Sequence, residues 1–182
     1  MLCDFAKFNL ITIKYIGYKT VVMRHFTATG YLMWNRGIFL HRHPKINLWL
    51  PPGGHVEADE DPVEAVLREI KEETGLLAAV SETPNQKNFH FDYPKSIIPP
   101  RHILEEDIDD PIDGFHNHID MIYYCKPITG INQLLPGWKL FSYLELKKAQ
   151  QIYNHEKDSF DTSVYPPLDV LTIGIDAIEV TS

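Results

Sequence analysis

The chain contains very little cysteine: only Cys3 and Cys125 occur among its 182 residues. A disulfide scaffold needs several paired cysteines, so this count excludes a small disulfide-stapled fold. Scarce cysteine is instead typical of proteins from a reducing compartment. We therefore expect a cytoplasmic protein.

Long hydrophobic runs are also missing. Residues 1–22 are rich in apolar side chains, but Lys7, Lys14 and Lys19 interrupt them, so the segment does not predict a membrane span. It also lacks the charged start and the small-residue cleavage site of a signal peptide. We expect either an N-terminal extension over residues 1–22 or a start codon assigned too early, followed by one domain over residues 23–182, with no membrane partner.

Positive charge is in deficit. There are 17 Lys and Arg residues against 25 Asp and Glu residues, which gives a formal net charge of −8. This balance argues against a nucleic-acid polymer or an anionic lipid surface as a partner. An anionic phosphate substrate would need local cations. The hydrophobic content of 44% is ordinary for a globular protein, and the length suits one domain with a substantial core.

The most informative stretch runs from Gly54 to Leu76, GHVEADEDPVEAVLREIKEETGL. Asp61 is a natural N-cap, Pro62 suits the first helical position, and Glu64 completes a capping box. Gly75 stands where a left-handed C-terminal stop is expected. The local chemistry therefore predicts a helix over Pro62–Thr74. Its apolar positions follow helical spacing and should face a core: Val63, Val66, Leu67, Ile70 and Thr74.

Three acids gather at the wrong end of this helix. Glu69, Glu72 and Glu73 lie in its last two turns, where the helix dipole is negative and each carboxylate costs about 0.3–1 kcal/mol. Arg68 can pair with Glu72, but one arginine cannot neutralise three glutamates. A hard divalent cation would balance this charge, because it prefers carboxylate oxygen. Taken alone, such a run is more often a solvated helix face.

The wider spacing favours the metal interpretation. Five residues separate Gly54 from Glu60, and seven separate Glu60 from the sequence Arg-Glu-Ile-Lys-Glu-Glu-Thr-Gly-Leu at residues 68–76. This segment resembles the complete Nudix box, G-x5-E-x7-R-E-U-x-E-E-x-G-U with U aliphatic, at every specified position. Nine specified positions make a chance match rare at average residue usage.

The resemblance implies an enzyme. Nudix hydrolases cleave a nucleoside diphosphate linked to another moiety, by attack of water on phosphorus with Mg²⁺ or Mn²⁺. Carried onto this sequence, the resemblance implies four metal ligands: the Gly54 carbonyl and the carboxylates of Glu69, Glu72 and Glu73. Glu69, Glu72 and Arg68 would be the catalytic residues, with Glu69 the first candidate to activate water and Arg68 orienting the glutamates. Glu60 would support the metal site.

The remaining pattern predicts an α/β fold. Strand-like segments occur at residues 25–34, 38–42, 48–50, 78–81, 87–91, 101–106, 115–125 and 138–141, and helical ones at 143–152 and 166–180. Mixed strands flanked by helices predict an α/β/α sandwich with a mixed β-sheet, which agrees with the Nudix fold. Residues 94–100 and the acidic run 105–111 are expected as loops that set substrate specificity.

Residues outside the box supply candidates for substrate binding. Arg42 could meet a phosphate, or it could be the solvated end of a hairpin. Tyr93 lies 17 residues after Leu76. That spacing is similar to the tyrosine of dinucleoside polyphosphate hydrolases, although simple loop packing also accounts for it.

The strand at residues 115–125 carries a second group of candidates. His116, His118 and Asp120 share one face of it by alternation. This face could border the substrate cleft, hold a transition metal through two histidines at i and i+2, or be plain strand polarity. The family commonly uses one more carboxylate outside the box, and here Asp120, Glu105 and Glu106 are candidates.

Together these features predict a metal-dependent pyrophosphohydrolase. Its substrate is expected to be a small nucleoside diphosphate derivative: a nucleoside triphosphate, a dinucleoside polyphosphate or a nucleotide sugar. A homodimer is possible. The alternative is a non-catalytic nucleotide-binding sensor, which usually arises by loss of the box glutamates. All of these glutamates are present here.

Overall fold

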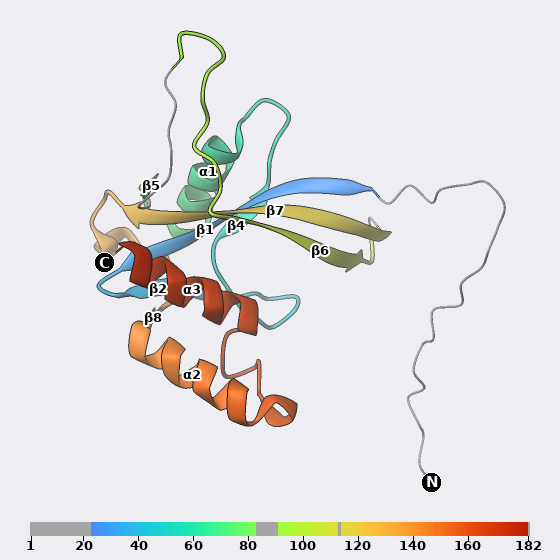
Figure 1. Ribbon diagram of the computed structural model, residues 1–182, viewed down its shortest axis with the longest axis vertical. Helices are drawn as coiled ribbons and strands as arrows, with labels where there is room; N and C mark the ends of the chain where they lie inside the picture. Colours follow the sequence, from blue (N-terminus) through green and yellow to red (C-terminus); the bar gives the residue numbers. More distant parts are fainter. Residues whose placement is uncertain (1–22, 83–90, 113, 182) are drawn as a thin grey trace, which may run out of the picture.

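The computed structural model describes residues 23–82, 91–112 and 114–181 (Figure 1). The strands are β1 Arg24–Trp34, β2 Gly37–Arg42, β3 Trp49–Leu50, β4 Gly53–His55, β5 Ala78–Val80, β6 His102–Asp110, β7 Gly114–Pro127 and β8 Trp138–Ser142. The α-helices are α1 Pro62–Thr74, α2 Tyr143–His155 and α3 Leu168–Thr181. The extension 1–22 and all but Phe91 of the expected strand 87–91 lie outside the described residues.

The strands form a mixed sheet, as predicted. β1 and β7 run parallel, from the pair Arg24 and Asn117 to the pair Leu32 and Cys125. The other pairings are antiparallel: β1 with β2 and β4, β2 with β3 and β8, and β7 with β5 and β6. The parallel pairing joins segments about ninety residues apart, and it places both strands in the middle of the sheet.

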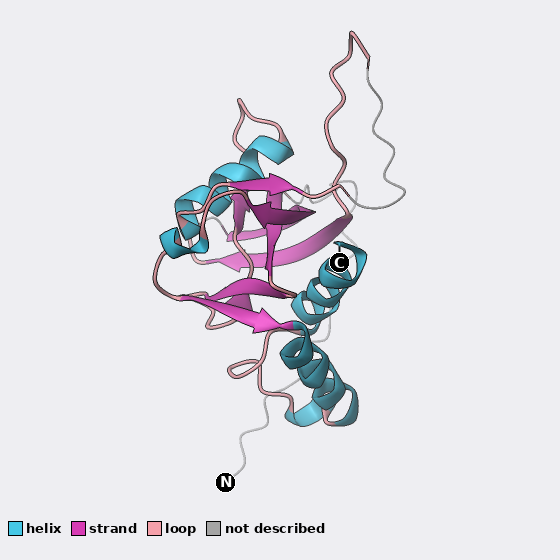
Figure 2. Cartoon of the chain, turned by 90° about the vertical axis from the view of Figure 1, so that its left-hand side faces the viewer, coloured by secondary structure: helices cyan, strands magenta, loops and turns pink. Residues whose placement is uncertain are grey.

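Alternation along the strands separates two cores. On one face, α1 packs on a cluster that includes Ala28, Leu32, Phe39, Tyr123 and Cys125. On the other face, α2 and α3 cover a cluster that includes Tyr31, Met33, Ile38, Ile122 and Tyr124. The helices thus flank the sheet on both sides (Figure 2), which confirms the α/β/α sandwich.

Helix α1 begins and ends where the sequence predicts. The Asp61 side chain accepts hydrogen bonds from the amides of Val63 and Glu64, and the Glu64 side chain accepts one from the Asp61 amide. Gly75 closes the helix at φ 75°, a left-handed conformation that glycine adopts without a Cβ penalty. Val66, Ile70 and Thr74 are buried, while Val63 and Leu67 pack at the edge of the core.

The acidic run differs from the expectation. Residues 105–110 are not a loop: they continue β6 and pair with β7 as far as the partners Asp110 and Gly114. The acids are tolerated in a strand because alternate side chains reach solvent, and because Asp107 accepts a hydrogen bond of 2.6 Å from the Asn117 amide group. Within the described residues, no helix has both the length and the apolar character needed to cross a bilayer.

Candidate active site

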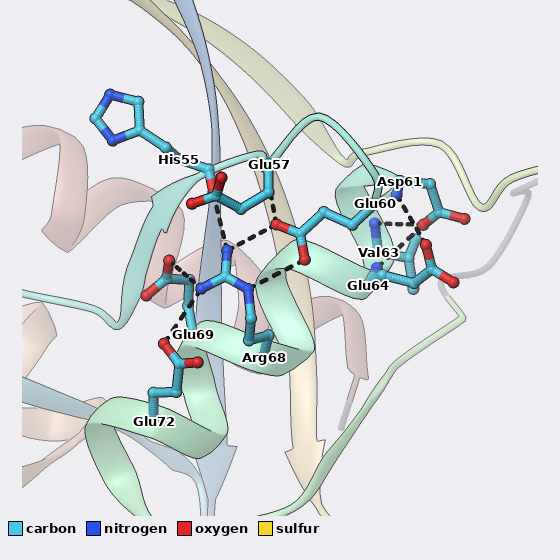
Figure 3. A network of polar contacts seen from close by, with 9 residues as sticks. All are labelled: His55, Glu57, Glu60, Asp61, Val63, Glu64, Arg68, Glu69 and Glu72. Atoms are coloured by element: carbon cyan, nitrogen blue, oxygen red, sulfur yellow. Dashed lines mark hydrogen bonds and ion pairs between the residues drawn. The ribbon is translucent and has the colours of Figure 1, made fainter.

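Arg68 organises the exposed side of α1. Its guanidinium makes five hydrogen bonds, which matches the five N–H donors of arginine. Two go to Glu60, from Nε at 3.1 Å and from Nη2 at 2.7 Å. Nη1 donates to Glu69 at 2.7 Å and to Glu72 at 3.2 Å, and Nη2 also donates to the His55 carbonyl at 3.0 Å (Figure 3). Arg68 thereby joins the box helix to β4.

These contacts also set the charge states of the network. The hydrogen bonds that Arg68 donates to Glu60 and Glu69 raise the pKa of Arg68 above its usual range. The hydrogen bond from Arg68 lowers the pKa of Glu60. The Glu60 side chain is only 12% exposed, so it depends on this bidentate partner.

Glu73 has a different environment. It lies one turn beyond Glu69, and its Oε2 accepts a hydrogen bond of 3.2 Å from the Gly53 amide. Burial raises the pKa of Glu73, and the charges of Glu69 and Glu72 add to this. Its backbone carbonyl accepts a 2.9 Å hydrogen bond from the indole of Trp138, which fixes the end of α1 against β8. Glu73 is therefore a partly buried carboxylate that forms no ion pair with a lysine or arginine of the described residues.

The donor set suits a hard divalent cation. One side of α1 offers the carboxylate oxygens of Glu69, Glu72 and Glu73. Gly54, which belongs to β4, lies directly beside Glu69. Arg68 engages Glu69 and Glu72, but Glu73 keeps its raised pKa. Oxygen donors with uncompensated charge are what Mg²⁺ and Mn²⁺ prefer. The residues present thus fit the metal that the box implies.

A cleft of about 340 Å³ opens beside this cluster. Residues of β1, β4, β6 and β7 line it, together with the start of α3. Acids and histidines from several elements line it, among them Glu73 of α1, Glu106 of β6, His118 and Asp120 of β7, and Asp169 of α3. Apolar walls come from Ile46, Leu50, Leu104 and Ile108. A cleft that is partly apolar with a few convergent polar groups is typical of a small-molecule site.

Asp120 lies at the floor of the cleft. It is 5% exposed, and its Oδ1 accepts hydrogen bonds of 3.0 Å from the hydroxyls of both Thr27 and Thr29. Burial raises the pKa of Asp120, although the two threonine hydrogen bonds oppose that shift. The position of Asp120 follows from the parallel register, which sets it opposite Thr27.

The two glutamates of β6 point to opposite sides. Glu106 lines the cleft, whereas Glu105 is exposed and pairs with Arg24 at 3.2 Å. Burial raises the pKa of Glu106 to about 7, and the charges of Asp120 and Asp169 contribute. A carboxylate with such a pKa can exchange a proton near neutral pH. Of the three candidate carboxylates outside the box, Glu106 and Asp120 therefore reach the cleft, and Glu105 does not.

Two expected substrate contacts lie elsewhere. Arg42 donates to Asn47 at 2.6 Å and to the Ser163 carbonyl, and it does not line the cleft. Tyr93 is 90% exposed and does not line it either. His41, next to Arg42, does face the cleft, because alternation turns adjacent strand residues to opposite sides. Within the described chain, its Nδ1 is buried without a hydrogen-bond partner.

Sequence reasoning also missed the surroundings of His118. His25 lies opposite it in the parallel register, and His55 and His116 stand within ring-contact distance. Burial lowers the pKa of His118 to about 4, and the neighbouring imidazoles add to this. His25 and His55 carry no motif of their own. Only the pairing of β1 with β4 and β7 would have revealed them.

Comparison with known proteins agrees with the fold and the box. The family model described as "NUDIX domain" matches residues 23–161. A crystal structure of a NUDIX family hydrolase from Clostridium perfringens is similar at 27% identity, with a TM-score of 0.67, over 87% of this chain and 99% of that one.

Curated relatives match over shorter segments. The m7GpppN-mRNA hydrolase NUDT17 of Xenopus laevis is 51% identical over 47 residues, which cover 23% of this chain and 16% of that protein. An RNA pyrophosphohydrolase of Bartonella tribocorum is 30% identical over 96 residues, 51% of this chain and 54% of that protein. The chain thus spans about half or less of the length of these two relatives.

Proposed function

This chain belongs to the Nudix family and is a Nudix hydrolase, and from that premise we propose that it is a divalent-metal-dependent pyrophosphohydrolase. Its substrate would be a small nucleoside diphosphate derivative, cleaved at the diphosphate linkage. One observation carries the proposal: the box carboxylates lie next to the cleft. Glu69 lies against Gly54, and Arg68 joins Glu69 to Glu72. Glu73 accepts from the Gly53 amide and faces the cleft that Asp120 and Glu106 share.

The box residues would hold the cation. Glu69, Glu72 and Glu73 provide the carboxylates, and the Gly54 carbonyl provides a fourth oxygen. When bound, Mg²⁺ or Mn²⁺ would neutralise charge on phosphate oxygens and lower the pKa of bound water. Arg68 donates one hydrogen bond each to Glu69 and Glu72, and its other three go to Glu60 and the His55 carbonyl, so these side chains are positioned before substrate arrives.

The cleft residues would handle the proton and orient the substrate. Glu106, with a pKa near 7, is suited to accept a proton from attacking water at neutral pH. Asp120 is fixed by two threonine hydroxyls, which suits a group that orients rather than moves. The His41 Nδ1, which has no hydrogen-bond partner among the described residues, offers a further substrate contact in the cleft.

A small nucleotide fits the charge of the chain better than a polymer. The net charge of −8 and the carboxylates around the cleft repel a polyanion except where cations bind. Two relatives are named as an m7GpppN-mRNA hydrolase and an RNA pyrophosphohydrolase. The test therefore includes the 5′ ends of short RNAs as alternative substrates.

The test is a substrate panel run separately with Mg²⁺ and Mn²⁺. Nucleoside triphosphates, dinucleoside polyphosphates, nucleotide sugars, capped RNA and 5′-triphosphorylated RNA are incubated with the chain, and released phosphate products are separated by chromatography. We expect metal-dependent release of a nucleoside monophosphate from at least one small nucleotide. Turnover of the RNA ends alone would reassign the substrate. Tight binding with no turnover across the panel would favour the non-catalytic sensor.

A further inference from the structure

A cluster of histidines lies at the edge of the cleft, apart from the box carboxylates. His25 comes from β1, His55 from β4, and His116 and His118 from β7. The register sets His25 opposite His118 and sets His55 opposite Thr27, two residues further along β1. Since residues two apart on a strand share a face, the pairing brings imidazoles from three strands together on one side of the sheet.

The ring nitrogens approach as ligands of one ion would. One nitrogen each of His25, His55 and His118 lie within 4.8 Å of one another. The His55 Nε2 and His25 Nδ1 atoms are 3.3 Å apart. Two nitrogens bound to one Zn²⁺ at about 2.0–2.1 Å and at a tetrahedral angle lie about 3.4 Å apart, so this spacing needs little adjustment.

His116 orients its neighbour. Its Nδ1 lies 2.9 Å from the Gly114 carbonyl oxygen, which can only accept, so Nδ1 carries the proton and Nε2 presents a lone pair. That Nε2 lies 3.2 Å from His118 Nε2. A hydrogen-bonded partner on the second ring nitrogen is the usual support of a histidine that binds a metal. His116 is thus a positioning residue for His118.

We propose that His25, His55 and His118 form a second metal site, which takes a transition-metal cation of the Zn²⁺ class rather than Mg²⁺. Imidazole nitrogen suits zinc, cobalt, nickel and copper, whereas Mg²⁺ demands oxygen. The side chain of His55 points away from the Arg68 network (Figure 3), so the histidines and the box glutamates are separate donor sets.

Cobalt titration of tag-free protein in excess Mg²⁺ tests this site. Co²⁺ replaces Zn²⁺ with the same ligands and reports coordination by nitrogen through its visible absorption. We expect uptake of one equivalent by the wild-type chain, displaced by Zn²⁺. His25→Ala and His118→Ala are expected to weaken binding by at least about 100-fold, and His116→Ala by roughly 10–100-fold.

Three controls keep the result interpretable. His55→Ala should lose cobalt binding. Because His55 is exposed, this change should disturb the fold least, as checked by circular dichroism. His155→Ala changes an exposed histidine on α2 and should bind like the wild type. Glu73→Gln would impair the hydrolase site but should keep its cobalt uptake. A failure of the proposed hydrolase function can therefore be distinguished from a failure of the histidine site. No uptake by the folded wild-type chain, or equal uptake by the His25→Ala and His55→Ala variants, would overturn the second site.

Discussion

The Glu69 carboxylate occupies the space in which a side chain on residue 54 would lie. A Cβ built on Gly54 would come within 2.4 Å of Glu69 Oε1 and 2.6 Å of its Cδ. Gly54 is therefore required by a close approach, and not by an unusual backbone angle. The first residue of the box and its first glutamate are a contacting pair although they are fifteen positions apart.

Gly54→Ala is expected to reduce turnover with little loss of stability. The added methyl group meets the flexible end of Glu69, so the carboxylate moves while the backbone stays in place. A displacement of about 1 Å in a catalytic group can cost roughly 100-fold in rate. Turnover of the best substrate in the panel and the melting temperature should be measured together.

Gly30→Ala is the matched control. Its Cβ would lie 2.7 Å from Ile70 Cδ1 and 2.9 Å from Val66 Cγ2, in the core under α1. Overpacking of this kind costs about 1–3 kcal/mol, so this variant should lose stability instead. Full turnover in Gly54→Ala, or unfolding as severe as in Gly30→Ala, would contradict the contact with Glu69.

Arg68→Lys is expected to weaken Mn²⁺ binding by roughly 10–100-fold, which is typical of a lost orienting partner. Lysine has three donors on one nitrogen and cannot reproduce the planar contacts to Glu60, Glu69, Glu72 and the His55 carbonyl. Isothermal titration calorimetry with Mn²⁺ measures the effect. Lys71→Gln, an exposed change on the same helix, should leave the affinity near the wild-type value. Equal affinities for both variants would show that Arg68 does not position the ligands.

Glu73→Gln is expected to separate stability from metal binding. The amide can still accept from the Gly53 amide, and a charge that burial disfavours is removed. In metal-free buffer at pH 7 the variant should be at least as stable as the wild type. A metal at 100 times its dissociation constant adds about 2.7 kcal/mol to the free energy of unfolding. Because the variant lacks one carboxylate ligand, Mn²⁺ should raise the melting temperature of the wild type much more than that of the variant. Marked unfolding of the metal-free variant would indicate a structural role.

Local chemistry determines the parts of this molecule that could be predicted. Asp61, Glu64 and Gly75 fix the ends of α1 by contacts within three or four residues, so its bounds could be predicted to the residue. Alternation likewise separates the two faces of β7: Ile122 and Tyr124 lie in one core cluster and Tyr123 in the other.

What could not be predicted depends on pairing between distant strands. The acids of β6 form a strand because β7 offers partners for them, such as Ile119 for Glu105 and His118 for Glu106. The histidines of the proposed second site meet only because β1 runs parallel to β7. The sequence does not set which face of β2 borders the cleft, and in the structure His41 lines it whereas Arg42 does not.

Glu106→Gln is expected to change how stability depends on pH. The folded pKa of Glu106, about 7, lies above its ordinary value of 4.5. The folded state therefore binds more protons than the unfolded state between these values, and this group's contribution to stability falls as pH rises from 4.5 to 7. Glutamine cannot titrate, so the stability of the variant relative to the wild type should increase across that window, by about 1–2 kcal/mol after allowance for solvent screening.

Urea unfolding of metal-free protein at several pH values between 4 and 8 measures this difference. Comparing variant with wild type cancels groups that both share, including His118. The folded pKa of His118, about 4, gives it the opposite slope: its contribution rises with pH from 4 to 6.5. Glu105→Gln is the matched control, because Glu105 is exposed and faces away from the cleft. A pH-independent difference for Glu106→Gln, or the same slope for Glu105→Gln, would show that Glu106 is not the group that titrates near neutral pH.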